Sequence, residues 1–196
     1  MAQKLLIAGD SFAAKYPDDT SVGWPLLLKQ YYDITNTAQA GVSEYKILKQ
    51  LKSVSNIGQY SLIIIAHTSP YRVHTRQSIH STELHKDCDL LMSDIDDKFS
   101  IRPSVFAAKG YFKHHFDPDY YEDMYSLLRK EIQNITRYTP TLHIDHFESS
   151  LKYAKEDFKL DLSQMWPYYK GNINHYTSEG NQLVCARILE KVKELR

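Results

Sequence analysis

Ser11 follows an apolar run that ends at Gly9-Asp10, in the segment Lys4-Leu5-Leu6-Ile7-Ala8-Gly9-Asp10-Ser11. A serine hydroxyl is a poor nucleophile at neutral pH, so it needs a general base within hydrogen-bond reach and N–H donors for the oxyanion that forms. His175 is the candidate base, because it lies in a polar segment, residues 172–181, just before the last helical pattern. Gly-Asp-Ser is also common turn chemistry. Catalysis by Ser11 therefore depends on what the fold brings beside it.

Polar residues also follow the second and third apolar runs. Gly41 ends the segment Asn36-Thr37-Ala38-Gln39-Ala40-Gly41, and without a Cβ its backbone N–H can approach a bound oxygen closely. His67 and Thr68 follow the third run, and Arg72, four residues further on, can contact an anionic group of a substrate. Together with Ser11 these residues form a candidate substrate site.

Strands and helices must alternate to position these residues. Apolar runs predict strands over residues 4–8, 33–38, 61–66 and 141–147. Helical spacing of apolar residues predicts helices over about 24–31, 43–58, 117–135 and 177–195, with Ser43 and Asp117 as N-caps. The predicted fold class is α/β, with a central parallel sheet covered on both sides.

Ligands of such sheets bind beyond the carboxyl ends of the strands, where Ser11, Gly41 and the segment after Ala66 would meet. We expect one domain over residues 1–196, with an insertion at about 70–116, where the pattern loosens into short helices and loops. Substrate specificity would reside in this insertion.

Composition narrows the classes of partner. Lys plus Arg and Asp plus Glu both total 24, so we expect neither nucleic acid nor a membrane surface as partner. Cys88 and Cys185 fit no metal or redox spacing and predict reduced thiols in a cytoplasmic protein. The histidines other than His67 and His175 show no ligand spacing, and phosphate-binding glycine motifs are missing from the sequence. We therefore expect no metal and no cofactor.

Taken together, the strand-end segments resemble the SGNH or GDSL hydrolase superfamily. Its blocks are Gly-Asp-Ser after the first strand, Gly after the second, Gly-x-Asn after the third, and Asp-x-x-His before the final helix. The resemblance runs from residue 5 to the C-terminus, and GDSFAA, GWP, AQAGVSEYKI and HTSPYR are similar to a small subgroup from bacteria and phages. It implies a three-layer α/β/α sandwich of the flavodoxin-like SGNH type.

The same resemblance implies the roles of individual residues. Ser11 would be the nucleophile, His175 the general base, and the backbone N–H groups of Ser11 and Gly41 two oxyanion donors. Ala66-His67-Thr68 replaces the Gly-x-Asn block, so the Thr68 hydroxyl or a His67 ring N–H would have to substitute for the Asn donor. Losing one oxyanion donor costs a serine protease about 2.7 to 4 kcal/mol.

Asn172 stands where the family has the triad Asp. Its carbonyl can accept the Nδ1–H of His175 and fix the ring, although it cannot stabilise the imidazolium by charge. A Ser-His dyad held by Asn172 or by a main-chain carbonyl is the preferred version. Asp157, Asp161 and Glu179 are other possible acceptors.

The resulting expectation is a serine esterase or O-deacylase that acts on a small-molecule or glycan ester through an acyl-enzyme. One alternative is a non-catalytic ligand-binding module that kept the pocket of the family. Another is an acyltransferase that uses the same serine. The sequence leaves the substrate and the oligomeric state open.

Overall fold

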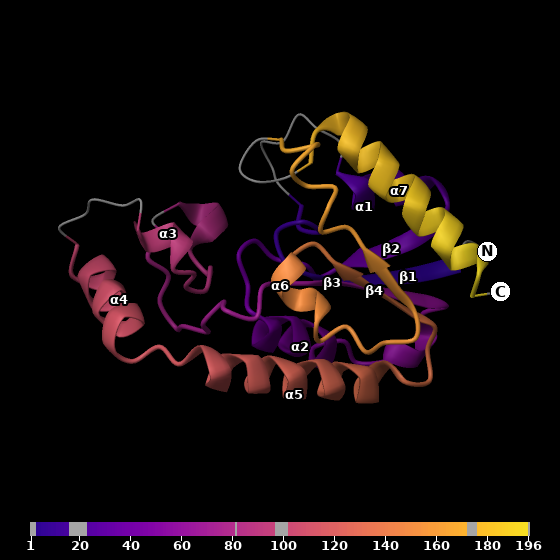
Figure 1. Ribbon diagram of the computed structural model, residues 1–196. Helices are drawn as coiled ribbons and strands as arrows, with labels where there is room; N and C mark the ends of the chain where they lie inside the picture. The colour runs from indigo at the N-terminus through magenta and orange to yellow at the C-terminus, as the bar shows by residue number, and fades with distance from the viewer. Residues whose placement is uncertain (1–2, 16–22, 81, 97–101, 172–175, 196) are drawn as a thin grey trace.

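The computed structural model describes residues 3–15, 23–80, 82–96, 102–171 and 176–195, and its centre is a five-stranded parallel sheet (Figure 1). The strand order is β2-β1-β3-β4-β5, and every neighbouring pair is parallel. The strands are β1 (Gln3–Gly9), β2 (Tyr32–Asn36), β3 (Leu62–His67), β4 (Thr141–Asp145) and β5 (Lys159–Asp161). The first four confirm the predicted strands with small shifts at their ends, whereas β5 was not predicted.

The helices fall between the strands and after them. They are α1 (Trp24–Leu27), α2 (Glu44–Lys52), α3 (Ser93–Asp96), α4 (Pro103–His114), α5 (Pro118–Thr136), α6 (Glu148–Leu151) and α7 (Ser178–Lys193). Asp117 caps α5 as predicted, because its carboxylate accepts the N–H groups of Asp119 and Tyr120. The prediction for Ser43 was wrong in one respect. Ser43 precedes α2, but its hydroxyl makes no capping bond, and its own backbone N–H instead donates to Asp89 at 2.7 Å.

Helices cover both faces of the sheet, which makes the expected three-layer sandwich. Successive residues of a strand point to opposite faces. Ile7 and Ile64 therefore join the core beneath α1 and α7, whereas Leu6 and Ile63 join the core beneath α2 and α5. Figure 1 shows α7 on one side of the sheet and α2 with α5 on the other.

The segment from residue 70 to residue 116 carries α3 and α4 and a small apolar cluster of its own. Ile79, Ile95, Val105 and Ala108 are its buried members. Figure 1 shows α3 and α4 beside the sheet rather than over either face. We call this segment the lobe.

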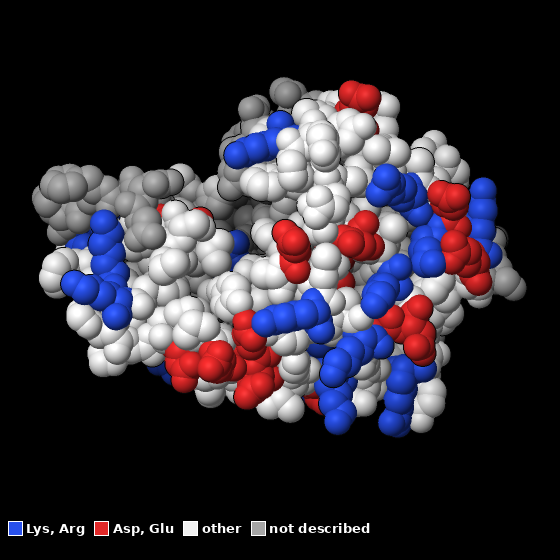
Figure 2. Space-filling view, in the orientation of Figure 1, with Lys and Arg blue, Asp and Glu red and all other residues white. Residues whose placement is uncertain are grey.

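Two properties of the described residues bear on the environment of the chain. Both cysteines, Cys88 and Cys185, are buried and free. No helix in the described part of the chain is long and apolar enough to cross a membrane. Figure 2 shows acidic and basic side chains interspersed over the face in view, as the balanced composition predicts.

Candidate functional site

The turn that carries Ser11 is fixed by Gly9 and Gln50. A Cβ on Gly9 would lie 2.7 Å from the Cβ and carbonyl oxygen of Ala66, so only glycine lets the end of β1 lie this close to β3. The Gln50 amide on α2 accepts the Gly9 N–H at 2.8 Å and donates to the Gly9 carbonyl at 3.1 Å. Ser11 follows two residues later, half-buried, at the carboxyl end of β1.

Gly41 is held in a left-handed conformation after β2. Its φ is +62°, and a Cβ there would lie 2.4 Å from the Cys88 sulfur. Its carbonyl accepts the Asp89 N–H at 2.8 Å and the Arg72 Nη1 at 3.3 Å. The lobe therefore fixes the orientation of this peptide.

Ser11, Gly41 and Arg72 line one cavity of about 290 Å³. Part of its wall belongs to the core, and the other part belongs to the lobe. The core supplies Phe12, Ala40, Phe147 and Trp166, and the lobe supplies His80, His85, Cys88, Leu91, Ser93 and Asp94. The structure thus brings three of the predicted site residues together. The lobe residues were not predicted individually, because the irregular apolar pattern of residues 70–116 does not indicate which side chains face the site.

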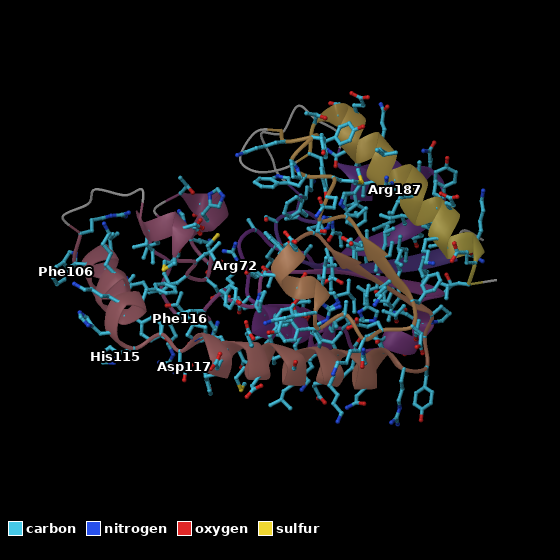
Figure 3. All side chains as sticks on the ribbon, in the orientation of Figure 1. Arg72, Phe106, His115, Phe116, Asp117 and Arg187 are labelled. Carbon is cyan, nitrogen blue, oxygen red and sulfur yellow. The ribbon has the colours of Figure 1, made fainter. Side chains whose placement is uncertain are left out.

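Arg72 is anchored from both sides of the cavity. Its Nε donates to the Thr68 hydroxyl at 3.3 Å, its Nη1 donates to the Gly41 carbonyl, and Nη1 lies 3.7 Å from a carboxylate oxygen of Asp94. Figure 3 shows Arg72 between the lobe and the body that contains the sheet. The guanidinium is therefore a fixed cation at the wall that Ser11 shares.

Thr68 and His67 lie beneath the cavity rather than in its wall. Both are fully buried. The Thr68 hydroxyl accepts Arg72 Nε, and its carbonyl accepts the Tyr125 hydroxyl at 2.9 Å. His67 Nδ1 lies 2.6 Å from Glu44, and its Nε2 lies 2.9 Å from His143 Nδ1. The structure does not bring either side chain to the cavity that Ser11 lines.

Asp10 adds a buried carboxyl group beside Ser11. Its side chain is fully inaccessible, and its Oδ1 accepts the Phe12 N–H at 3.0 Å. Burial raises the pKa of Asp10 to about 7, and Glu44 adds to the rise, whereas the Phe12 N–H and Arg72 oppose it. A large share of Asp10 is therefore protonated near neutral pH.

The histidine pair under the site also has the residue types of a metal centre. Ligand atoms of His67, His143 and Glu156 all lie within 4.8 Å of one another and are buried. However, Arg129 donates to Glu156 at 2.8 Å and to Asp145 at 2.6 Å, and the two rings contact each other directly. The Arg129 guanidinium already supplies the positive charge that Glu156 and Asp145 need. We therefore interpret these buried residues as a structural network.

His175 and Asn172 lie outside the described residues. Their neighbour Tyr176 is described, and its ring centroid lies 5.3 Å from that of Phe12, the residue after Ser11. The Tyr176 hydroxyl bonds His146 Nδ1 at 2.9 Å, and the His146 ring stacks on Phe12 at 4.4 Å. Of the other acceptors considered for His175, Asp161 accepts both the N–H and the hydroxyl of Ser163.

Solved structures of lipases and esterases match the fold over nearly the whole chain. A lipase/acylhydrolase from Enterococcus faecalis matches with a TM-score of 0.55 at 15% identity, over 98% of this chain and 96% of that chain. The psychrotrophic esterase EstA from Pseudoalteromonas, in a structure inhibited by monoethylphosphonate, matches with a TM-score of 0.53 at 13% identity, over 98% of each chain. A lipolytic protein of the G-D-S-L family from Desulfitobacterium hafniense matches with a TM-score of 0.55 at 13% identity, over 96% of this chain and 99% of that chain.

At these identities the likeness is one of fold. No family model matches the chain, and no curated protein matches it in sequence. The fold is nevertheless clear: the chain has the α/β architecture of the GDSL or SGNH hydrolases, in agreement with the order of its sequence blocks.

Proposed function

We propose that the chain is a serine esterase or O-deacylase of the SGNH type. Ser11 Oγ attacks the carbonyl carbon of an ester while His175 takes the hydroxyl proton, and the N–H groups of Ser11 and Gly41 stabilise the oxyanion. His175 then returns the proton to the leaving alcohol. In the second step His175 takes a proton from a water molecule, which attacks the acyl carbonyl. The bond to Ser11 Oγ then breaks, and His175 returns the proton to that oxygen.

The contact between Tyr176 and Phe12 carries this proposal. These residues follow His175 and Ser11 in the chain, and their ring centroids are 5.3 Å apart. This contact supports the proposal that His175, the residue before Tyr176, serves Ser11 as general base. The solved structures with the same fold, a lipase/acylhydrolase and an esterase among them, support the same class of reaction.

Hydrolysis of 4-nitrophenyl acetate by the wild type, Ser11→Ala and Ser55→Ala tests the mechanism. Ser11→Ala removes the nucleophile, so kcat/KM should fall by about a thousandfold or more. Ser55 is exposed and does not line the cavity, so Ser55→Ala should keep wild-type activity. Wild-type rates in Ser11→Ala would show that another group does the chemistry.

A binding module without turnover is the second candidate, favoured by Asn172 in place of the triad Asp. In the same assay, Asn172→Asp restores the usual acid. Activity in the wild type that rises in Asn172→Asp would support a serine hydrolase with a weakened triad. Activity in neither protein would support the binding module.

A further inference from the structure

Arg72 is a nearly buried cation with incomplete pairing. Its side chain is only 8% exposed, and a charge in such a position needs a close counter-charge. The acidic group nearest to it in the cavity wall is Asp94, at 3.7 Å, and Asp94 is itself 31% exposed. Charge-assisted bonds between such groups are normally about 2.7 to 2.9 Å long. The pair is therefore loose.

The hydrogen-bonding capacity of Arg72 is also only partly used. A guanidinium has five N–H donors in a planar fork. Nε and Nη1 bond the neutral oxygens of Thr68 and Gly41. Within the described part of the chain, Nη2 makes no hydrogen bond. Donors therefore remain for a ligand in the cavity.

The other buried carboxyl group near Arg72 does not neutralise it fully. Asp10 is fully inaccessible, and its burial raises its pKa to about 7, so a substantial fraction of it is uncharged near neutral pH. His80 and His85, which also line the cavity, add no negative charge. The positive charge of Arg72 in the wall that Ser11 shares is therefore not fully balanced by the nearby carboxyl groups of Asp94 and Asp10.

We propose that this cavity selects esters that carry a carboxylate, and that Arg72 binds that carboxylate while Ser11 attacks the ester. The inference rests on the proposed function for the attack by Ser11. An incoming carboxylate would replace the loose contact with Asp94 by a short, charge-assisted contact to the free edge of the guanidinium. Asp94 is then a competitor of the substrate, and Arg72 a residue that determines specificity.

Monomethyl succinate and methyl butyrate test this selection, because they differ only by a carboxylate in place of a terminal methyl group. Methanol release gives kcat/KM for each ester. The wild type should prefer monomethyl succinate, and Arg72→Gln should lower the ratio of the two values roughly 10- to 100-fold, the range for loss of a hydrogen bond to a charged group. Arg72→Lys should retain part of the preference, and Asp94→Asn should increase it several-fold through a lower KM.

Arg187→Gln is the matched control, since Arg187 is an exposed arginine on α7, away from the lobe (Figure 3). Its ratio should equal that of the wild type. Circular dichroism checks the fold of every variant, and Arg72→Lys and Asp94→Asn keep the test decisive if Arg72→Gln does not fold. Equal or lower kcat/KM for monomethyl succinate in an active wild type would overturn the inference and leave the esterase proposal standing.

Binding separates the two proposals when no ester is hydrolysed. Two full-length proteins are titrated with monomethyl succinate in a calorimeter. The first carries Ser11→Ala, and the second carries both Ser11→Ala and Arg72→Gln. Binding by the first that the second loses would support the carboxylate site even where the proposed function fails. Binding that is equal in both proteins, or missing from both, would overturn the carboxylate site.

Discussion

Asp10 shows how a residue without a solvent contact can influence the site. It lies between Gly9, which is pinned by Gln50, and Ser11, and its carboxyl receives the Phe12 N–H that shapes the turn. A neutral Asp10 still accepts this bond through its carbonyl oxygen. The turn can therefore keep its shape in either protonation state, while the charged state bears the cost of burial.

The stability of the fold should therefore depend on pH through Asp10. Its pKa is about 7 in the folded chain and about 3.9 in an unfolded one, so the folded chain binds more protons in this interval. The free energy of unfolding then falls as the pH rises, by on the order of 3 kcal/mol between pH 5 and pH 8. Urea unfolding at both pH values should show this loss in the wild type and a smaller loss in Asp10→Asn.

The side-chain amide of the Asp10→Asn variant cannot ionise, but it keeps the oxygen that accepts the Phe12 N–H, so the comparison isolates the charge. The useful quantity is the difference between the two proteins at each pH, because other titrating groups affect both equally. An unchanged difference from pH 5 to pH 8 would show that Asp10 titrates normally.

Charged side chains join helix α5 to strand β4 and to the segment before β5. Arg129 of α5 donates to Asp145 at the end of β4 and to Glu156 in the segment before β5. All three residues are buried. The network therefore holds α5 against the carboxyl end of β4.

Arg129→Met should destabilise the chain by about 3 to 5 kcal/mol, because it leaves two buried carboxylates without their counter-charge. Lys52→Met is the matched control. Lys52 pairs with Glu131 at 3.1 Å on the exposed surface of α2 and α5, and its loss should cost less than about 1 kcal/mol. Chemical unfolding of the three proteins measures both values. Equal costs for the two variants would rule out the special role of the buried network.

Apolar patterning predicted the larger elements and failed on the smaller ones. Ile63 and Ile65 alternate with Leu62 and Ile64 in a run that is buried on both faces, and such a run predicts a central strand. The strand β5 has three residues with one half-buried leucine, too short a pattern to separate from a loop. The predicted helix over 43–58 ends earlier, at Lys52, and a separate short turn, Ile57–Gln59, precedes β3.

The whole molecule brings the candidate site together at one edge of the sheet. Parallel order places the ends of β1, β2 and β3 side by side, so the convergence of Ser11 and Gly41 follows from topology alone. The orientation of His67 and Thr68 does not follow from topology. It depends on Glu44 and Tyr125, which α2 and α5 bring from elsewhere in the chain. Arg72 lies in the wall because its guanidinium donates to the Thr68 hydroxyl and to the Gly41 carbonyl, both outside the lobe.

Covalent labelling by a fluorophosphonate probe tests the assignment of Ser11 most directly, since a phosphonate reacts with an activated serine hydroxyl without any choice of substrate. Intact mass and peptide mapping should show one adduct per chain, on the peptide that contains Ser11. His175→Ala should slow the labelling, and Ser11→Ala should abolish it. Labelling that persists in Ser11→Ala, or a wild type that stays unlabelled under conditions that label a known serine esterase, would contradict the account.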